Sequence, residues 1–167
     1  MIAIQQPKLA TVEIRSAQPA DTEALFGLIQ ALAAYEKLSD SVTGSAELLR
    51  SHLFGDRPFA EALVAEAHPI DGSETSVVGL ALFFYNYSTF LTKPGIYLED
   101  LFVLPAYRGQ GVGKALLQGT IERARVQNCG RVEWSVLDWN APAIAFYEHM
   151  GADVLPDWRI CRVVLES

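Results

Sequence analysis

Apolar side chains recur at helical spacing in two stretches of the first third of the chain. The i, i+3, i+4, i+7 pattern of one helix face is followed by Leu25, Leu28, Ile29 and Leu32. We therefore predict a helix from Pro19 to about Tyr35, whose first turn carries two acidic residues that favour the positive end of the helix dipole. A second, shorter helix is predicted after Thr43 or Ser45, and Gly55 ends it.

Alternating or continuous apolar residues, many of them β-branched or aromatic, predict strands elsewhere. The expected strands are residues 11–15, 59–67 and 77–85, the stretch that begins at Tyr97, and residues 131–137 and 159–165. Residues 68–76 form a short loop rich in turn residues, so the strands on either side of it should pair antiparallel.

Two more helices complete the predicted order. One follows a glycine-rich turn and carries apolar residues from Leu116 to Ala124, and the other begins after Asn140, accepts Pro142 in its first turn and ends at Gly151. The order is then β-α-α-β-β-β-α-β-α-β. It predicts an α/β or α+β fold in which a mixed, mainly antiparallel sheet is flanked by helices.

Composition narrows the class of protein. The 167 residues are half hydrophobic, which fits one domain spanning residues 1–167, with a loose tail at residues 1–10. The net charge of -7 argues against a nucleic-acid partner, because backbone phosphates require clustered Lys and Arg. No apolar run is long enough for a membrane helix, so we expect no membrane partner and a cytoplasmic location. The two cysteines and three histidines lack metal-ligand spacing, so we expect no metal site.

The segment from Tyr97 to Lys114 contains the most informative motif. An apolar strand with two carboxylates is followed by Pro105 and then by glycines at alternate positions in R-G-Q-G-V-G. The motif lacks the Ser or Thr of a Walker loop and the spacing of the dinucleotide fingerprint. Glycines let the backbone approach a ligand closely, and a helix N-terminus offers unpaired N–H groups. This turn can therefore hold a pyrophosphate, although a simple tight connection is the alternative interpretation.

Several segments resemble a known family. R-G-Q-G-V-G, preceded by L-F-V-L-P-A-Y, resembles the acetyl-CoA signature R/Q-x-x-G-x-G/A of the GNAT N-acetyltransferases, and W-N-A-P-A-I-A-F-Y resembles their second cofactor segment. With A-Y-E-K-L and Y-L-E-D-L-F-V, the chain from about Thr11 is similar to the diamine (spermidine/spermine) acetyltransferase family. The resemblance implies the GNAT fold, acetyl-CoA as co-substrate without a metal, a homodimer, and direct acetyl transfer to a small cationic amine.

The resemblance also implies roles for individual residues. The implied cofactor site consists of Leu101, Phe102, Val103, Arg108, Gly109, Gly111, Gly113, Lys114, Asn140 and Tyr147. The first three would offer backbone groups to the acetyl arm from a bulged strand, and the next five would hold the pyrophosphate. The implied substrate site consists of Glu36, Glu99, Asp100 and Ser88.

Acetyl transfer to an amine requires removal of a proton, because an ammonium group has no lone pair and its pKa is near ~10. Glu99 is the candidate base, acting directly or through water, and an electrostatic anchor for the substrate is the open alternative. Adjacent strand residues point to opposite faces, so Glu99 and Asp100 cannot share one pocket unless the strand is bulged. Tyr147 is the candidate acid for the departing thiolate, with simple aromatic packing as its alternative.

The identity of the amine stays open. Relatives that acetylate polyamines carry an Asp in the segment 87–91, where this chain has the uncharged Ser88 and Thr89. The absence of this acidic residue favours a shorter diamine or a lysine-like amino acid such as thialysine as the substrate. Two other functions remain as hypotheses, namely acetylation of a protein N-terminus or lysine, and a non-catalytic domain that senses acyl-CoA.

Overall fold

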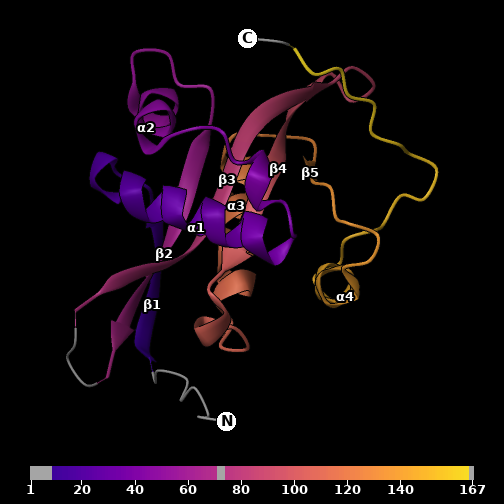
Figure 1. Ribbon diagram of the computed structural model, residues 1–167. Helices are drawn as coiled ribbons and strands as arrows, with labels where there is room; N and C mark the ends of the chain where they lie inside the picture. Colours follow the sequence, from indigo (N-terminus) through magenta and orange to yellow (C-terminus); the bar gives the residue numbers. More distant parts are fainter. Residues whose placement is uncertain (1–8, 71–73, 166–167) are drawn as a thin grey trace. The chain divides into compact units, whose positions relative to one another are not determined.

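The computed structural model describes residues 9–70 and 74–165 (Figure 1). The chain divides into two compact units. The first unit extends to Trp134 and the second begins at Ser135. Each unit is described here by itself, so the single-domain organisation stays a prediction. Most of the expected N-terminal tail lies outside the described residues, and the first strand already begins at Leu9. Among the described residues, no helix has the length and apolar character needed to cross a membrane.

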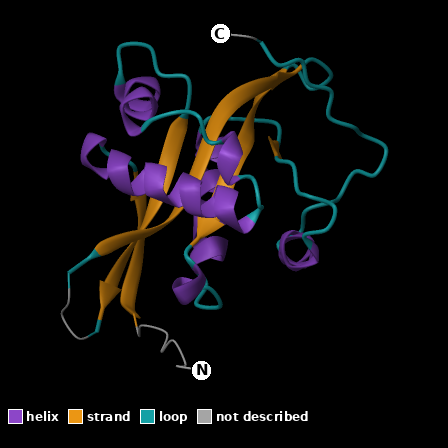
Figure 2. Ribbon diagram, viewed as in Figure 1, coloured by secondary structure: helices purple, strands orange, loops and turns teal. Residues whose placement is uncertain are grey.

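The first unit is built on a five-stranded sheet with the order β1-β2-β3-β4-β5. Its strands are β1 (Leu9–Ser16), β2 (Glu61–Pro69), β3 (Ser76–Ser88), β4 (Lys93–Val103) and β5 (Val132–Glu133). The first four strands pair antiparallel, whereas β5 runs parallel to β4 after a helical crossover. The predicted mixed, mainly antiparallel sheet is confirmed (Figure 2).

Helices α1 (Thr22–Tyr35), α2 (Ala46–Phe54) and α3 (Val112–Val126) belong to the first unit, with short 3-10 turns η1 (Pro19–Asp21), η2 (Ser39–Ser41) and η3 (Pro105–Tyr107). The Ser45 hydroxyl accepts a hydrogen bond from the Leu48 amide and so caps α2. The second unit contains α4 (Ala141–His149), which Asn140 caps by accepting from the Ala143 amide at 3.4 Å. The predicted N-termini of α2 and α4 are thus confirmed.

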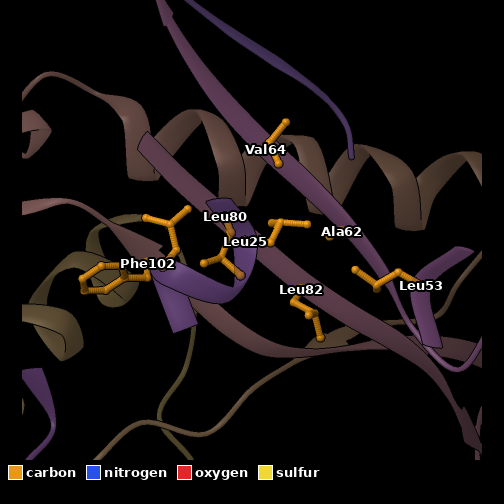
Figure 3. Close-up of a cluster of buried hydrophobic side chains, with 8 residues drawn as sticks. Leu25, Leu53, Ala62, Val64, Leu80, Leu82 and Phe102 are labelled. Carbon is orange, nitrogen blue, oxygen red and sulfur yellow. The ribbon is translucent and has the colours of Figure 1, made fainter. Parts of the chain in front are cut away.

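The apolar side chains of α1 pack against one face of the sheet, and together with residues of α2, β2, β3 and β4 they form a core cluster (Figure 3). Its fully buried members are Leu25, Leu28, Leu53, Ala62, Val64, Leu80, Leu82 and Phe102. Helix α3 covers the other face, where a Cβ added to Gly79 or Gly119 would press against side chains of α3, β1 and β2. Because different helices bury the two faces of the sheet, the central strands are apolar along most of their length and do not alternate between apolar and polar residues.

Strand β4 contains a bulge at Glu99. Leu82 of β3 pairs with Asp100 and the next residue, Phe83, pairs with Leu98, so Glu99 has no partner in this ladder. Because β3 alternates regularly, Leu98 faces α3 together with Phe83, while Asp100 faces α1 together with Leu82. The bulge that the resemblance implied is therefore present.

The structure differs from the sequence prediction at three segments. Residues 86–95 lie outside the strands predicted from the sequence, but β3 and β4 extend through most of them and leave only Thr89–Thr92 as a turn. Strand β5 spans two residues rather than residues 131–137. The last strand, expected at 159–165, is not formed, because a strand needs a neighbour for its hydrogen bonds and the described part of the second unit contains none.

An ion-pair network joins the first two strands to the start of α1. The Arg15 guanidinium donates to both oxygens of Asp21, at 2.7 and 2.9 Å, and to Glu66 Oε2 at 2.7 Å. Hydrogen bonds from Arg15 and from the Gln18 amide hold the pKa of Asp21 below its usual value. Asp21 is buried, so its charge depends on these donors.

We predict that Arg15→Met destabilises the protein by roughly 2–3 kcal/mol, because Asp21 and Glu66 lose their common donor. Arg15→Lys should recover only part of the loss, since an ammonium group cannot bind both carboxylates with a rigid fork. Urea denaturation at pH 7 measures both variants. A loss under 0.5 kcal/mol in Arg15→Met would show that the network contributes little.

Candidate active site

Three carboxylates converge where α1 ends beside the bulge of β4. Glu36 is the residue that ends α1, and Glu99 and Asp100 lie on β4, more than sixty positions later in the sequence. Burial, and to a smaller extent the negative charges of Glu99 and Glu36, together raise the pKa of Asp100 to about 6. Burial also raises the pKa of Glu36. The two electrostatic effects show that these acidic groups lie within reach of one another.

The carboxylates lack cationic partners among the described residues of the first unit. Each of the seven ion pairs found there joins other groups, such as Arg15 with Asp21 and Arg131 with Glu133. Glu99 is exposed, whereas Asp100 is half-buried. A cluster of unpaired acids with partial burial is a natural site for a positively charged ligand.

The glycine-rich turn has the geometry that a phosphate site requires. Gly109 and Gly111 have φ values of 73° and 82°, which other residues rarely adopt, and a Cβ at either would meet nothing within 4 Å. Gly111 caps α3, so Gly113 and the exposed Lys114 lie in the first turn. The first N–H groups of this helix have no intrahelical acceptor, and they lie next to a turn with open space around it.

The end of β4 beside this turn has one edge that β5 does not cover. One edge of β4 pairs with β3, and the other edge pairs with β5 only at Ile96 and Tyr97. From Glu99 onward, no strand among the described residues pairs with this second edge. Leu101, Phe102 and Val103 lie in this stretch, and their other edge is bonded to β3. An extended ligand with amide groups could pair with the uncovered edge as a strand would.

The side chain of Arg108 contacts the end of β4 and the end of α1. Its Nε donates to the Val103 carbonyl at 2.9 Å, and its guanidinium lies over the rings of Tyr35 and Phe102, with centroids at 4.8 and 5.3 Å. The side chain therefore connects the glycine turn to the end of α1. Sequence reasoning missed Tyr35 as its partner, although A-Y-E-K-L places Tyr35 directly before Glu36.

Ser88 lies apart from the acidic cluster. It pairs with Lys93 at one end of the β3–β4 hairpin, seven residues along β4 from Asp100, which corresponds to roughly 20 Å at ~3.3 Å per residue. Its hydroxyl is buried and accepts hydrogen bonds from the Leu91 amide and from Arg131, each at 3.3 Å. The structure therefore does not bring Ser88 together with the other predicted substrate residues.

The remaining predicted residues belong to the second unit. Asn140 caps α4, and Tyr147 lies in the second turn of this helix with its ring 5.3 Å from that of Phe146. Pro142 occupies the first turn, and Gly151 follows the helix with a φ of 87°. The local prediction for this segment is confirmed, while the catalytic role of Tyr147 stays a prediction.

We predict that Asp100→Asn stabilises the fold at neutral pH. The shift of the pKa from 3.8 to about 6 means that ionised Asp100 costs about 3 kcal/mol relative to an unperturbed Asp. The native state binds the proton more tightly, so this cost is absent below pH 3.8, grows between pH 3.8 and 6, and is complete above pH 6. Urea denaturation should show a gain of about 1–3 kcal/mol at pH 7.5 that disappears near pH 4. Glu99→Gln, an exposed control, should gain less, and a pH-independent effect of Asp100→Asn would contradict the shifted pKa.

Comparisons with known proteins identify the family of this chain. Residues 30–152 match the Acetyltransferase (GNAT) family. The chain is 42% identical over 146 residues to the thialysine N-epsilon-acetyltransferase of Sus scrofa, covering 86% of this chain and 85% of that protein. It is 35% identical over 189 residues to the L-ornithine N5-acetyltransferase of Arabidopsis thaliana, covering 90% and 83%. A crystal structure of a probable acetyltransferase shares the fold with a TM-score of 0.75 at 20% identity, covering 93% and 99%. The chain therefore belongs to the GNAT family and is an N-acetyltransferase.

Proposed function

We propose that this enzyme transfers the acetyl group of acetyl-CoA to the side-chain amine of a small cationic substrate, of the lysine-like amino acid or short diamine class. The observation that carries the proposal is the cluster of Glu36, Glu99 and Asp100, which has no cationic partner in the described part of the first unit. Thialysine and ornithine, in the names of two relatives, are both amino acids that carry an amino group on the side chain.

Acetyl-CoA would supply an activated thioester, and the residues of the glycine turn fit its phosphates. Open space at Gly109 and Gly111, with the N–H groups at the start of α3, favours a pyrophosphate there. We assign the acetyl arm to the uncovered edge of β4 at Leu101, Phe102 and Val103. Lys114 would add positive charge at the first turn of α3, and Arg108 would do so from its position beside the turn.

Asp100 is the better proton acceptor of the two adjacent acids. Its pKa of about 6 lies closer to neutral pH than that of an ordinary carboxyl group, and a base with such a pKa still ionises at pH 7. We propose that Asp100 removes a proton from the substrate ammonium, directly or through water. Glu36 and the exposed Glu99 would then hold the charge of the substrate. This assignment reverses the roles that the sequence suggested for Glu99 and Asp100.

Tyr147 would complete the transfer by donating its phenolic proton to the departing thiolate, and Asn140 would bind the cofactor. The homodimer that the resemblance implies and the cytoplasmic location expected from the sequence also remain predictions.

A thiol-release assay with acetyl-CoA tests the function directly. Putrescine, spermidine, lysine, ornithine, thialysine and a lysine-containing peptide should be compared side by side, and we expect turnover to be fastest with ornithine or thialysine. Activity on the peptide alone would assign the enzyme to protein acetylation. Binding of CoA without turnover of any amine would support the sensor hypothesis.

Asp100→Asn should lower kcat by ~10²–10⁴-fold with the best amine, because the amide cannot accept the proton. Glu99→Gln is the matched control, and it should mainly raise the KM for the amine through the loss of one charge. If Glu99→Gln lowered kcat more than Asp100→Asn, Glu99 would be the base.

Tyr147→Phe keeps the ring and removes only the hydroxyl group. We expect kcat to fall by ~10–10⁴-fold if the phenol is the general acid. Phe146→Leu, which changes the neighbouring ring, serves as the control for packing in α4. Near-full activity in Tyr147→Phe would remove Tyr147 from the mechanism.

A further inference from the structure

A second group of charged side chains lies on the outer pair of strands and is not used by the proposed chemistry. In the antiparallel ladder of β1 and β2, Glu13 pairs directly with Glu66, and His68 lies two residues further along β2. Residues at i and i+2 share a face, and directly paired residues share it too. The strand register therefore places Glu13, Glu66 and His68 on one face of the sheet.

The distances between their ligand atoms fit a single small cation. His68 Nε2 lies 3.6 Å from Glu66 Oε1 and 3.9 Å from Glu13 Oε2, and the three atoms all lie within 4.8 Å of one another. A tetrahedral zinc ion with ligands at ~2.0–2.2 Å places those ligands roughly 3.4 Å apart. Small rotations of exposed side chains are enough to close the difference, since the backbone of both strands is fixed by the ladder.

Arg15 gives Glu66 the fixed orientation that a ligand needs. The guanidinium holds Glu66 through Oε2, with Nε at 3.2 Å and Nη2 at 2.7 Å, so Oε1 stays directed toward His68. Asp21 accepts hydrogen bonds from Nη1 and Nη2 of the same guanidinium. The carboxylates of Glu13, Glu66 and Asp21 and the guanidinium of Arg15 have a summed charge of -2 when His68 is neutral. This charge matches a divalent cation. Outer contacts of this kind orient the ligands in protein metal sites.

We propose that Glu13, Glu66 and His68 bind one divalent transition-metal ion, with zinc as the best match. An imidazole with two carboxylates suits zinc, whereas magnesium and calcium prefer oxygen ligands alone. Glu13 is 61% exposed, so water completes the coordination from the solvent side. The ion would clamp β1 to β2 and stabilise the sheet edge, independently of acetyl transfer. The sequence could not indicate this site, because Glu13 and His68 are separated by the whole of α1 and α2.

Isothermal titration of the full chain with zinc chloride at pH 7 tests the proposal. We expect one zinc ion per chain, and the loss of that binding or at least a tenfold weaker affinity in both His68→Gln and Glu13→Gln. His52→Gln is the matched control, since His52 packs edge-on against Phe59 in another part of the unit and should keep wild-type binding.

Thermal unfolding gives a second readout that does not depend on activity. Zinc should raise the melting temperature of the wild type and of His52→Gln, but not that of His68→Gln, whose melting temperature without zinc should match the wild type. An ordinary surface ion pair predicts no zinc binding, or binding that both cluster variants retain. Either result would overturn the proposal.

Discussion

The extra residue in β4 is the constraint on which the arrangement of the active site depends. In a regular strand Ile96, Leu98, Asp100 and Phe102 would share one face, and Asp100 would enter the core under α3 beside Leu98. The bulge at Glu99 exchanges the faces, so that Leu98 stays under α3 while Asp100 and Phe102 turn toward α1. A single unpaired residue thus lets one strand supply the core on one side and the acid beside the end of α1 on the other.

The acidic cluster shows how folding and binding oppose each other. Half-burial of Asp100 near Glu99 and Glu36 makes its ionised form unfavourable, and the same surroundings raise its pKa toward neutral pH. A cationic amine bound at this cluster would relieve the repulsion, so the destabilisation in the free enzyme would contribute to affinity for the amine. An apolar or neutral cluster would be more stable and could neither attract nor deprotonate an ammonium group.

Local patterns were sufficient to predict most elements. The spacing of Leu25 and Leu28, and the cap at Asn140 with Pro142, are short-range signals that depend little on the rest of the fold. Residues 86–95 were misjudged because Asn86 and Ser88 are typical of loops, yet in the structure they are held by cross-strand pairing and by hydrogen bonds to Glu133 and Arg131. The expected last strand failed for the converse reason, because an apolar pattern does not supply the partner that a strand requires.

The glycine turn was identified from its sequence, whereas the contacts of the Arg108 side chain were not. A motif indicates that a positive charge lies near the phosphates, whereas the side chain here bonds the Val103 carbonyl and lies over Tyr35 and Phe102. Such cation–π contacts contribute about 0.5–2 kcal/mol each, and a phosphate that drew the guanidinium away would forfeit them. Backbone N–H groups carry no such cost, because the positive φ of Gly109 and Gly111 already directs the chain around open space. Phosphate binding in this turn would therefore depend chiefly on the backbone and the start of α3. Arg108 would add charge from beside the turn while its contacts with Val103 and Tyr35 hold the end of α1, and with it Glu36, beside β4.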